Sequence, residues 1–268
     1  MEHLLNTPGV IRVAIFLAVL VLLVAIEAWR RGPNPPVRRK HRWPSNGGLA
    51  LVDTLLARLL LPAGAVGAAL WAQSRGLGLF NATAWPAWLE FGLALVLLDL
   101  AIYWQHRWLH AFPVLWRLHR VHHTDATLDA TSALRFHPLE ILLSLAYKVA
   151  LAVALGVAPL AMLVFEVLLS SFALFTHANL SLPAGFDRVV RRLLVTPAMH
   201  RIHHSVHGAE QRRNFGFNLS LWDRAFGSYA AAHRDPVLRI GVQGVGGEQA
   251  TRFGALLREP FVDRGRRG

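Results

Sequence analysis

The chain has 268 residues, of which 54% are hydrophobic and only 16% carry a charged side chain. This balance is uncommon in a soluble domain of this length and is typical of a membrane protein. The net charge of +12 comes from basic residues that gather in loops between apolar runs, so we exclude a nucleic acid as partner. Because there is no cysteine, disulfides and thiolate-bound iron–sulfur clusters are excluded as well.

Four or five apolar segments are candidates for membrane spans, because each approaches the length that crosses about 30 Å of hydrocarbon. The first is followed by arginines rather than by a small-residue cleavage site, which predicts a retained span and not a secretory signal. The last two are separated by Gly156 and Pro159 and are predicted to form a membrane hairpin. The segments are approximately 10–28, 49–72, 87–104, 139–155 and 160–177.

The distribution of positive charge predicts the orientation of these spans. The loop at 30–42 is rich in arginine and lysine, whereas the loop at 73–85 contains only Arg75. The positive-inside rule therefore places the first loop in the cytoplasm. Counting the later crossings places each histidine cluster described next on the cytoplasmic side, in an inner or cytoplasmic membrane.

Three clusters of histidine follow a helical spacing. Residues three or four apart share one face of a helix, so each cluster presents two or three imidazoles to one point. Imidazole is the side chain that most often binds transition metals without a thiolate, and eight imidazoles exceed the four ligands of one tetrahedral zinc. The pattern predicts a site for two metal ions, formed by His106, His110, His119, His122, His123, His200, His203 and His204. Pro113 is expected to end one helix so that the next folds back towards the same point.

Further polar residues near these clusters are candidate members of the site. Asp99 and Tyr103 lie on the same helical stripe as His106, and an aspartate at the end of a span needs a polar partner. Orienting a ligand imidazole through its other ring nitrogen would supply that partner, with interfacial solvation as the alternative. His177 is a candidate for a ninth ligand. Asn179, His137 and His207 are left open as further ligands or supporting residues.

At these residues the chain resembles the fatty acid hydroxylase / sterol desaturase superfamily of integral-membrane di-iron enzymes. The resemblance rests on the ordered HxxxH, HxxHH and late HxxHH boxes, with Arg135-Phe-His-Pro-Leu-Glu140, His177-x-Asn179 and the closing segment 214–229 around them. It covers about Phe91 to Tyr229. The chain departs from some members at position 181, where Ser181 stands in place of a second histidine.

The resemblance implies an all-α integral-membrane helical bundle of about four spans, with a cytoplasmic helical cap that carries the histidine-rich dimetal site. Residues 1–90 would form N-terminal spans and a basic loop, 91–230 the catalytic domain and 231–268 a C-terminal tail. It also implies two iron ions, with zinc able to replace them in purified protein, and no catalytic residue beyond the metal ligands. Members hydroxylate or desaturate lipid-like substrates with dioxygen and two electrons.

The electrons are expected from a separate ferredoxin-, flavoprotein- or cytochrome-type donor, because the sequence has no dinucleotide fingerprint and no cysteine. The basic residues Arg191, Arg192, Arg212 and Arg213 either steer an acidic donor or form a solvated face. The expected function is oxidation of a C–H bond in a membrane lipid such as a sterol, fatty acyl chain, sphingolipid or isoprenoid.

The principal alternative is a membrane metal-binding or metal-transport protein without oxygenase activity. A transport pathway should place ionisable residues in series through the spans, and the few that are present form no series. A zinc hydrolase would need an HExxH pairing, which is missing, and bis-histidine haem binding would favour isolated histidines on facing helices.

Overall fold

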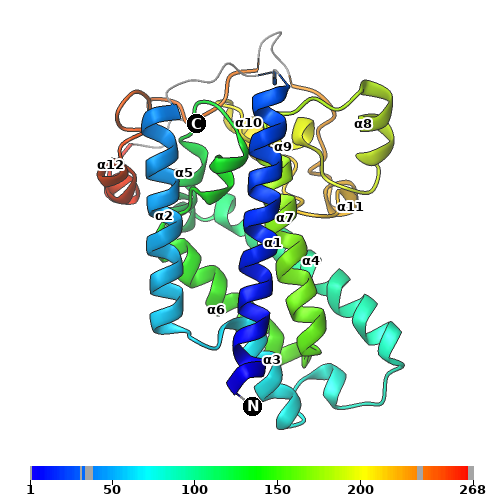
Figure 1. Ribbon diagram of the computed structural model, residues 1–268. Helices are drawn as coiled ribbons and strands as arrows, with labels where there is room; N and C mark the ends of the chain where they lie inside the picture. Colours follow the sequence, from blue (N-terminus) through cyan, green and yellow to red (C-terminus); the bar gives the residue numbers. More distant parts are fainter. Residues whose placement is uncertain (1, 31, 34–38, 234–237, 265–268) are drawn as a thin grey trace.

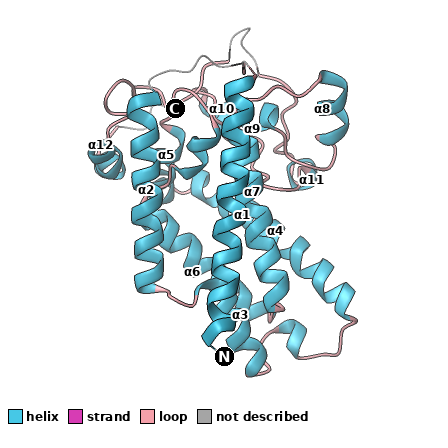
Figure 2. Cartoon of the chain, viewed as in Figure 1, coloured by secondary structure: helices cyan, strands magenta, loops and turns pink. Residues whose placement is uncertain are grey.

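The computed structural model describes residues 2–30, 32–33, 39–233 and 238–264, and within these ranges the regular structure is helical (Figure 2). Arg31 and residues 34–38 of the basic loop lie outside the described residues, as do 234–237 and 265–268 of the C-terminal tail. The long helices are α1 (Glu2–Trp29), α2 (Arg39–Leu60), α3 (Gly64–Ser74), α4 (Ala87–Ala111), α5 (Pro113–His123), α6 (Pro138–Leu155) and α7 (Pro159–His177). The short ones are η1 (Leu79–Asn81), η2 (Ala130–Leu134), α8 (Ala184–Val190), α9 (Pro197–His203), α10 (Gly208–Gln211), α11 (Leu221–Ala225), α12 (Phe253–Arg258) and η3 (Glu259–Phe261).

Five helical stretches of the described residues are long and apolar enough to cross a membrane, as predicted. They are Gly9–Trp29, Arg39–Asn81, Ala87–Ala111, Pro138–Leu155 and Pro159–His177. The second stretch contains α2, α3 and η1 rather than one helix, and the first break occurs because α2 ends at Leu60 and Pro62 cannot continue the helical hydrogen-bond pattern. The chain is a multi-pass integral membrane protein.

The spans form a bundle with a cap of short helices at one end. The C-terminal end of α1, the start of α2 and helices α5, α9 and α10 lie at this end, whereas α3 and the N-terminus lie at the other (Figure 1). The described part of the basic loop and the histidine-bearing helices are therefore on the same side of the bundle, as the charge distribution predicts.

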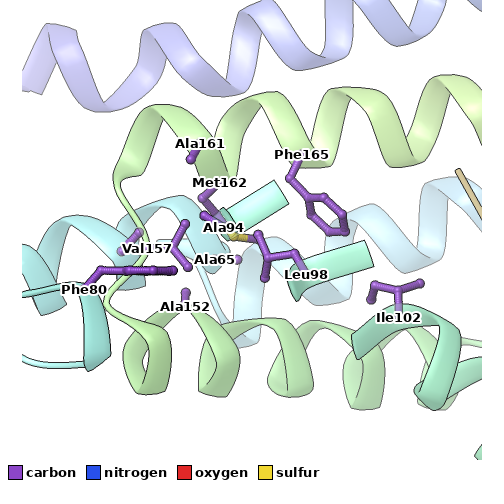
Figure 3. Close-up of a cluster of buried hydrophobic side chains, with 11 residues drawn as sticks. Ala65, Phe80, Ala94, Leu98, Ile102, Ala152, Val157, Ala161, Met162 and Phe165 are labelled. Carbon is purple, nitrogen blue, oxygen red and sulfur yellow. The ribbon is translucent and has the colours of Figure 1, made fainter. Parts of the chain in front are cut away.

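The end of the bundle opposite the cap is held by an apolar core between α3, α4, α6 and α7. Small side chains such as Ala94, Ala152 and Ala161 let the helices approach closely, and Leu98 and Phe165 fill the space between them (Figure 3). Below this core the backbones of Gly78 and Gly156 meet, and a Cβ atom on Gly78 would lie 2.2 Å from the amide nitrogen of Gly156. Both glycines also adopt positive φ angles, so this close contact between the two backbone segments depends on the absence of a side chain at each position.

Residues at the cap end are joined to the spans by charged side chains. The Glu27 carboxylate at the end of α1 accepts hydrogen bonds of 2.8 Å from the backbone amides of Ala130 and Asn179. The α12 segment packs on α2 and η3 packs on α5, where Arg120 pairs with Glu259 at 3.0 Å. These contacts attach the end of α1 to the segments around Ala130 and Asn179, and the C-terminal segment to α2 and α5.

Candidate metal centre

Four helices bring nine histidines to one place at the cap end of the bundle. The histidines of α4 and α5 meet because Phe112, whose backbone is extended, separates the two helices, and α5 starts at Pro113 and packs against α4. This confirms the predicted turn. The contributors are His106 and His110 from α4, His119, His122 and His123 from α5, His177 from α7, and His200, His203 and His204 from the α9 segment.

The nine histidines divide into two groups, and within each group the candidate ligand atoms lie within 4.8 Å of one another. The five-histidine group contains His106, His110, His119, His123 and His203. The four-histidine group contains His122, His177, His200 and His204. Among the described residues, these two groups are the ones in which three or more potential metal ligands converge. Their size and proximity agree with the predicted site for two metal ions.

Each HxxHH box is divided between the two groups. On α5, His119 and His123 belong to the five-histidine group and His122 belongs to the four-histidine group. In the α9 segment the division is the reverse: His200 and His204 belong to the four-histidine group and His203 to the five-histidine group. The groups are adjacent, because the rings of His123 and His204 stack with centroids 4.2 Å apart. The structure therefore places two members of each box at one point and the third at the neighbouring point.

Five of the histidines are held through their Nδ1 atoms. A carbonyl or carboxylate oxygen only accepts hydrogen bonds, so the proton of each ring lies on Nδ1 and the lone pair is on Nε2. The pairs are His106 with Phe215 O (2.8 Å), His203 with Arg213 O (2.8 Å), His122 with Arg135 O (3.2 Å), His177 with Ala173 O (2.7 Å) and His119 with Glu140 Oε1 (2.7 Å).

The resulting arrangement of Nε2 atoms fits metal cations. His122 and His177 face each other with their Nε2 atoms 3.0 Å apart, although both rings keep their protons on Nδ1. Two lone pairs at this distance repel unless they share a cation. In the five-histidine group, the Nε2 atoms of His106, His110 and His203 are buried without a hydrogen-bond partner. Neutral imidazoles with converging lone pairs are the donors that first-row transition metals prefer.

Burial keeps five of these imidazoles in the neutral, ligand-competent form. It lowers the pKa of His203 to about 3. Burial, followed by the neighbouring histidines, lowers the pKa values of His122, His123, His200 and His204 well below their usual range. Eight of the nine side chains are buried; the exception is His110, which is half-buried. The ring of Trp116 lies against this open edge, 4.9 Å from His110.

A buried network of charges holds the loop between α5 and α6 in place. Arg42 of α2 makes two hydrogen bonds to Asp125, at 2.6 and 2.7 Å, and a third to Asp129 at 2.9 Å. Arg135 donates to Asn46 at 2.8 Å and to the carbonyl of Ala250 at 2.6 Å. Burial opposes ionisation of Asp125, but the guanidinium groups of Arg135 and Arg42 outweigh it and lower the pKa of this carboxyl.

Asp99 and Tyr103, predicted beside the site, lie outside both histidine groups. The Asp99 carboxylate accepts hydrogen bonds from Asn218 Nδ2 at 2.9 Å, from the amide of Leu219 at 3.2 Å and from Trp222 Nε1 at 2.8 Å. Its described partners therefore belong to the segment after the last histidine box. Tyr103 is buried, with its hydroxyl 2.8 Å from Ser228 Oγ in the same part of the cap.

The three residues left open by the sequence also lie outside the two groups. His137 precedes α6, where its Nδ1 accepts from the amide of Leu139 at 3.2 Å and its Nε2 lies 3.2 Å from Leu257 O. His207 directly precedes α10, and its backbone amide donates to Ser205 Oγ at 3.2 Å. The backbone amide of Asn179 donates to Glu27.

Sequence reasoning missed the residues that orient the imidazoles. Glu140 belongs to the quoted Arg135-Phe-His-Pro-Leu-Glu140 segment, and the available signal was an acidic residue in the first turn of a helix that starts at Pro138. Arg135 contributes through its backbone carbonyl, and the carbonyls of Phe215 and Arg213 act in the same way. Backbone acceptors carry no sequence signature, so no pattern could have identified them.

The chain matches the family model described as fatty acid hydroxylase over residues 91–228. It is 33% identical over 184 residues to the ornithine lipid hydroxylase OlsE of Rhizobium tropici, covering 68% of this chain and 54% of that protein. It is 27% identical over 213 residues to an alkylglycerol monooxygenase of Danio rerio, covering 79% of this chain and 45% of that protein.

A further relative is the Delta(7)-sterol-C5(6)-desaturase of Nicotiana tabacum, 32% identical over 158 residues, with 56% of this chain and 53% of that protein covered. The chain thus spans about half the length of the curated relatives that it matches. No solved structure matches it.

Proposed function

The chain belongs to the fatty acid hydroxylase family, and from this premise we propose that it oxidises a C–H bond of a membrane lipid, with dioxygen and two external electrons as co-substrates. The observation that supports this most directly is the convergence of nine histidines into two adjacent groups whose buried Nε2 atoms face one another. A metal-storage or transport role would not require two such groups side by side at one end of the spans.

We propose that the two groups each hold one iron ion, with His106, His110, His119, His123 and His203 as candidate ligands of one and His122, His177, His200 and His204 of the other. The pair of irons would supply the activation of dioxygen that C–H oxidation requires. Zinc, which also accepts imidazole ligands, would compete for the groups in purified protein.

The chain's own residues have three tasks in this proposal. The carbonyls of Phe215, Arg213, Arg135 and Ala173 hold rings so that their Nε2 atoms converge. The Glu140 carboxylate does the same for His119 and also makes that imidazole a stronger donor. The surrounding burial excludes water from the reacting centre.

The substrate class follows from the position of the site and from the relatives. The half-buried edge at His110 and Trp116 belongs to the α4–α5 junction, where the apolar side chains of Phe112 and Val114 are 55% and 73% exposed. A lipid chain can approach such an edge directly from the bilayer. The relatives named above are a hydroxylase of ornithine lipid, a monooxygenase of alkylglycerol and a desaturase of sterol, which supports a lipid as substrate.

We place the site on the cytoplasmic side of an inner or cytoplasmic membrane. The histidine helices lie at the same end of the bundle as Arg30 and the start of α2, and the positive-inside rule assigns this end to the cytoplasm. A separate cytoplasmic protein of the ferredoxin, flavoprotein or cytochrome type would then deliver the electrons.

The metal content of the purified full chain tests the proposal. Detergent-purified protein from iron-fed cells is expected to contain about two irons per chain by mass spectrometry. His106→Ala in the five-histidine group and His177→Ala in the four-histidine group should each lose about half of the iron, because each group holds one ion. His207→Ala, outside both groups, is the matched control and should keep it all.

The lipid reaction is tested separately by comparing the lipids of cells that express the wild type with those of cells that express His203→Ala/His204→Ala. A lipid gaining one oxygen atom, or losing two hydrogens, only with the wild type would support oxygenation or desaturation. A folded wild-type protein that retains no iron would contradict the di-iron proposal.

A further inference from the structure

Five large apolar side chains remain exposed on the cap between residues 184 and 226. Their exposed fractions are 59% for Phe186, 62% for Val189, 52% for Leu193, 40% for Leu221 and 38% for Phe226. Scattered apolar residues are normal on a protein surface, but apolar residues that gather in one region indicate a surface that binds something apolar.

Helix α8 and the turn after it have three distinct faces. Phe186, Val189 and Leu193 fall within an arc of about 60° at helical spacing. The second face carries Asp187, which is buried and pairs with Arg191. Arg191 also donates to the carbonyl of Ala231 at 3.0 Å, so this face packs against the rest of the cap. Arg188 and Arg192, both exposed, occupy the third face. An apolar face beside a basic one is typical of helices that lie in a membrane interface.

The apolar surface continues onto a membrane-spanning helix. The carbonyl of Leu193 accepts a hydrogen bond of 2.9 Å from the amide of Ser220, which joins the end of the α8 turn to the start of α11. At the other end of α11, the ring of Phe226 lies 5.0 Å from that of Trp104 on α4. Helices α8 and α11 project from the bundle on the same flank (Figure 1). A surface continuous with a span is a surface that the bilayer can reach.

The charges beside this surface select the kind of lipid. Arg188 and Arg192 flank the exposed apolar face of α8, and Arg107 lies over the ring of Trp104 at 5.2 Å. Tryptophan at the membrane–water boundary and arginine within reach of lipid phosphates are the usual components of an interfacial anchor.

We propose that the α8–α11 face, defined by Phe186, Val189, Leu193, Leu221 and Phe226, inserts into the interfacial layer of the bilayer, with Arg188 and Arg192 bound to anionic lipid headgroups. This contact fixes the cap against the membrane on the α4 side of the bundle. The inference rests on the membrane-spanning architecture and is independent of the metal and of the reaction.

The absence of cysteine from the chain makes a direct test practicable, because a single introduced cysteine can carry a nitroxide label. The full-length variants Phe186→Cys, Val189→Cys and Leu193→Cys would be reconstituted in nanodiscs of phosphatidylcholine, with or without phosphatidylglycerol. Collisions of the label with lipid-soluble oxygen and with a water-soluble nickel chelate report its depth. We expect the oxygen-to-nickel ratio at these three positions to exceed severalfold the ratio at Arg188→Cys and at the exposed position Gln249→Cys.

The role of the arginines is tested by adding Arg188→Gln/Arg192→Gln to the Val189→Cys variant. Phosphatidylglycerol should increase the depth of the label in the parent, and this increase should vanish in the arginine double variant. A depth that does not respond to phosphatidylglycerol in the parent would overturn the headgroup contact. High nickel accessibility at all three apolar positions would overturn membrane insertion, and three separate positions keep the test valid if one variant fails to fold.

Discussion

The two ends of the bundle are stabilised by different kinds of packing. At the end away from the cap, α3, α4, α6 and α7 meet through alanine, leucine and phenylalanine side chains (Figure 3). At the cap end, many histidines, arginines and acids are buried beside the apolar residues, and they form hydrogen bonds with one another or with backbone atoms. The packing of the apolar end depends on the size of its side chains, whereas the packing of the polar end depends on specific hydrogen-bond and ion-pair partners.

This difference determines how each end should respond to substitution. Removing apolar volume leaves a cavity whose cost depends on the volume lost. Removing one partner from a buried ion pair leaves the other charge without compensation, which costs more than the pair itself contributes. Substitutions at the apolar end should therefore change stability alone, and substitutions at the cap end should change stability and metal binding together.

The largest effect is expected from Arg135→Met. This change removes one of the two guanidinium groups that face Asp125 and leaves Asn46 Oδ1 and the carbonyl of Ala250 without their donor, at a cost of about 3–5 kcal/mol. Because the Arg135 backbone also holds His122, both stability and iron content should fall sharply. Unfolding in detergent and mass spectrometry for iron are the measurements. Wild-type iron content in Arg135→Met would contradict the proposed link between this network and the four-histidine group.

Leu98→Ala tests the apolar end. Leu98 is fully buried in the core of Figure 3, so its truncation should destabilise the chain by about 3 kcal/mol. Iron per folded chain should stay at the wild-type level. Leu59, which is 75% exposed, provides the matched control, since Leu59→Ala creates no cavity and should leave both quantities unchanged. Loss of iron from folded Leu98→Ala would mean that the two ends are coupled.

Acid should destabilise the metal-free protein through its buried histidines. The pKa of His203 is about 3 in the folded chain and has its ordinary value, about 6.5, in the unfolded chain. Between these values only the unfolded chain binds the proton, so stability falls as the pH falls. This histidine alone should remove about 2 kcal/mol at about pH 5. The unfolding midpoint of chelator-treated protein measures the effect, and the His203→Asn variant should show a shallower dependence.

Glu140→Gln should have the smallest effect of the four. The amide oxygen still accepts a hydrogen bond from Nδ1 of His119, but a neutral acceptor makes the imidazole a weaker donor. We expect iron affinity to fall about tenfold with little change in stability. Competition with a chelator measures the affinity, and Glu248→Gln, at an exposed carboxylate, is the matched control. Unchanged affinity would remove Glu140 from the support of the site.

Sequence spacing was sufficient to locate the nine histidines but not to group them. Helical periodicity puts His119, His122 and His123 on one face, yet their rings diverge enough that His122 faces the other group. The division depends on where α7 and the α9 segment pack, and those contacts join residues far apart in the chain. Asp99 illustrates the same difficulty, because its partners at 218–222 lie more than a hundred residues away in sequence.

The sequence by itself determined the membrane character, the helical class, the gathering of the histidines at the same end of the bundle as the basic loop, and the family, because hydropathy, charge and short-range spacing are local properties. Only the tertiary structure decided which histidines share a group, which carbonyls and which carboxylate orient their rings, and which part of the cap remains apolar and exposed. These features arise from contacts between distant segments, where backbone acceptors and buried partners leave no pattern in the order of residues.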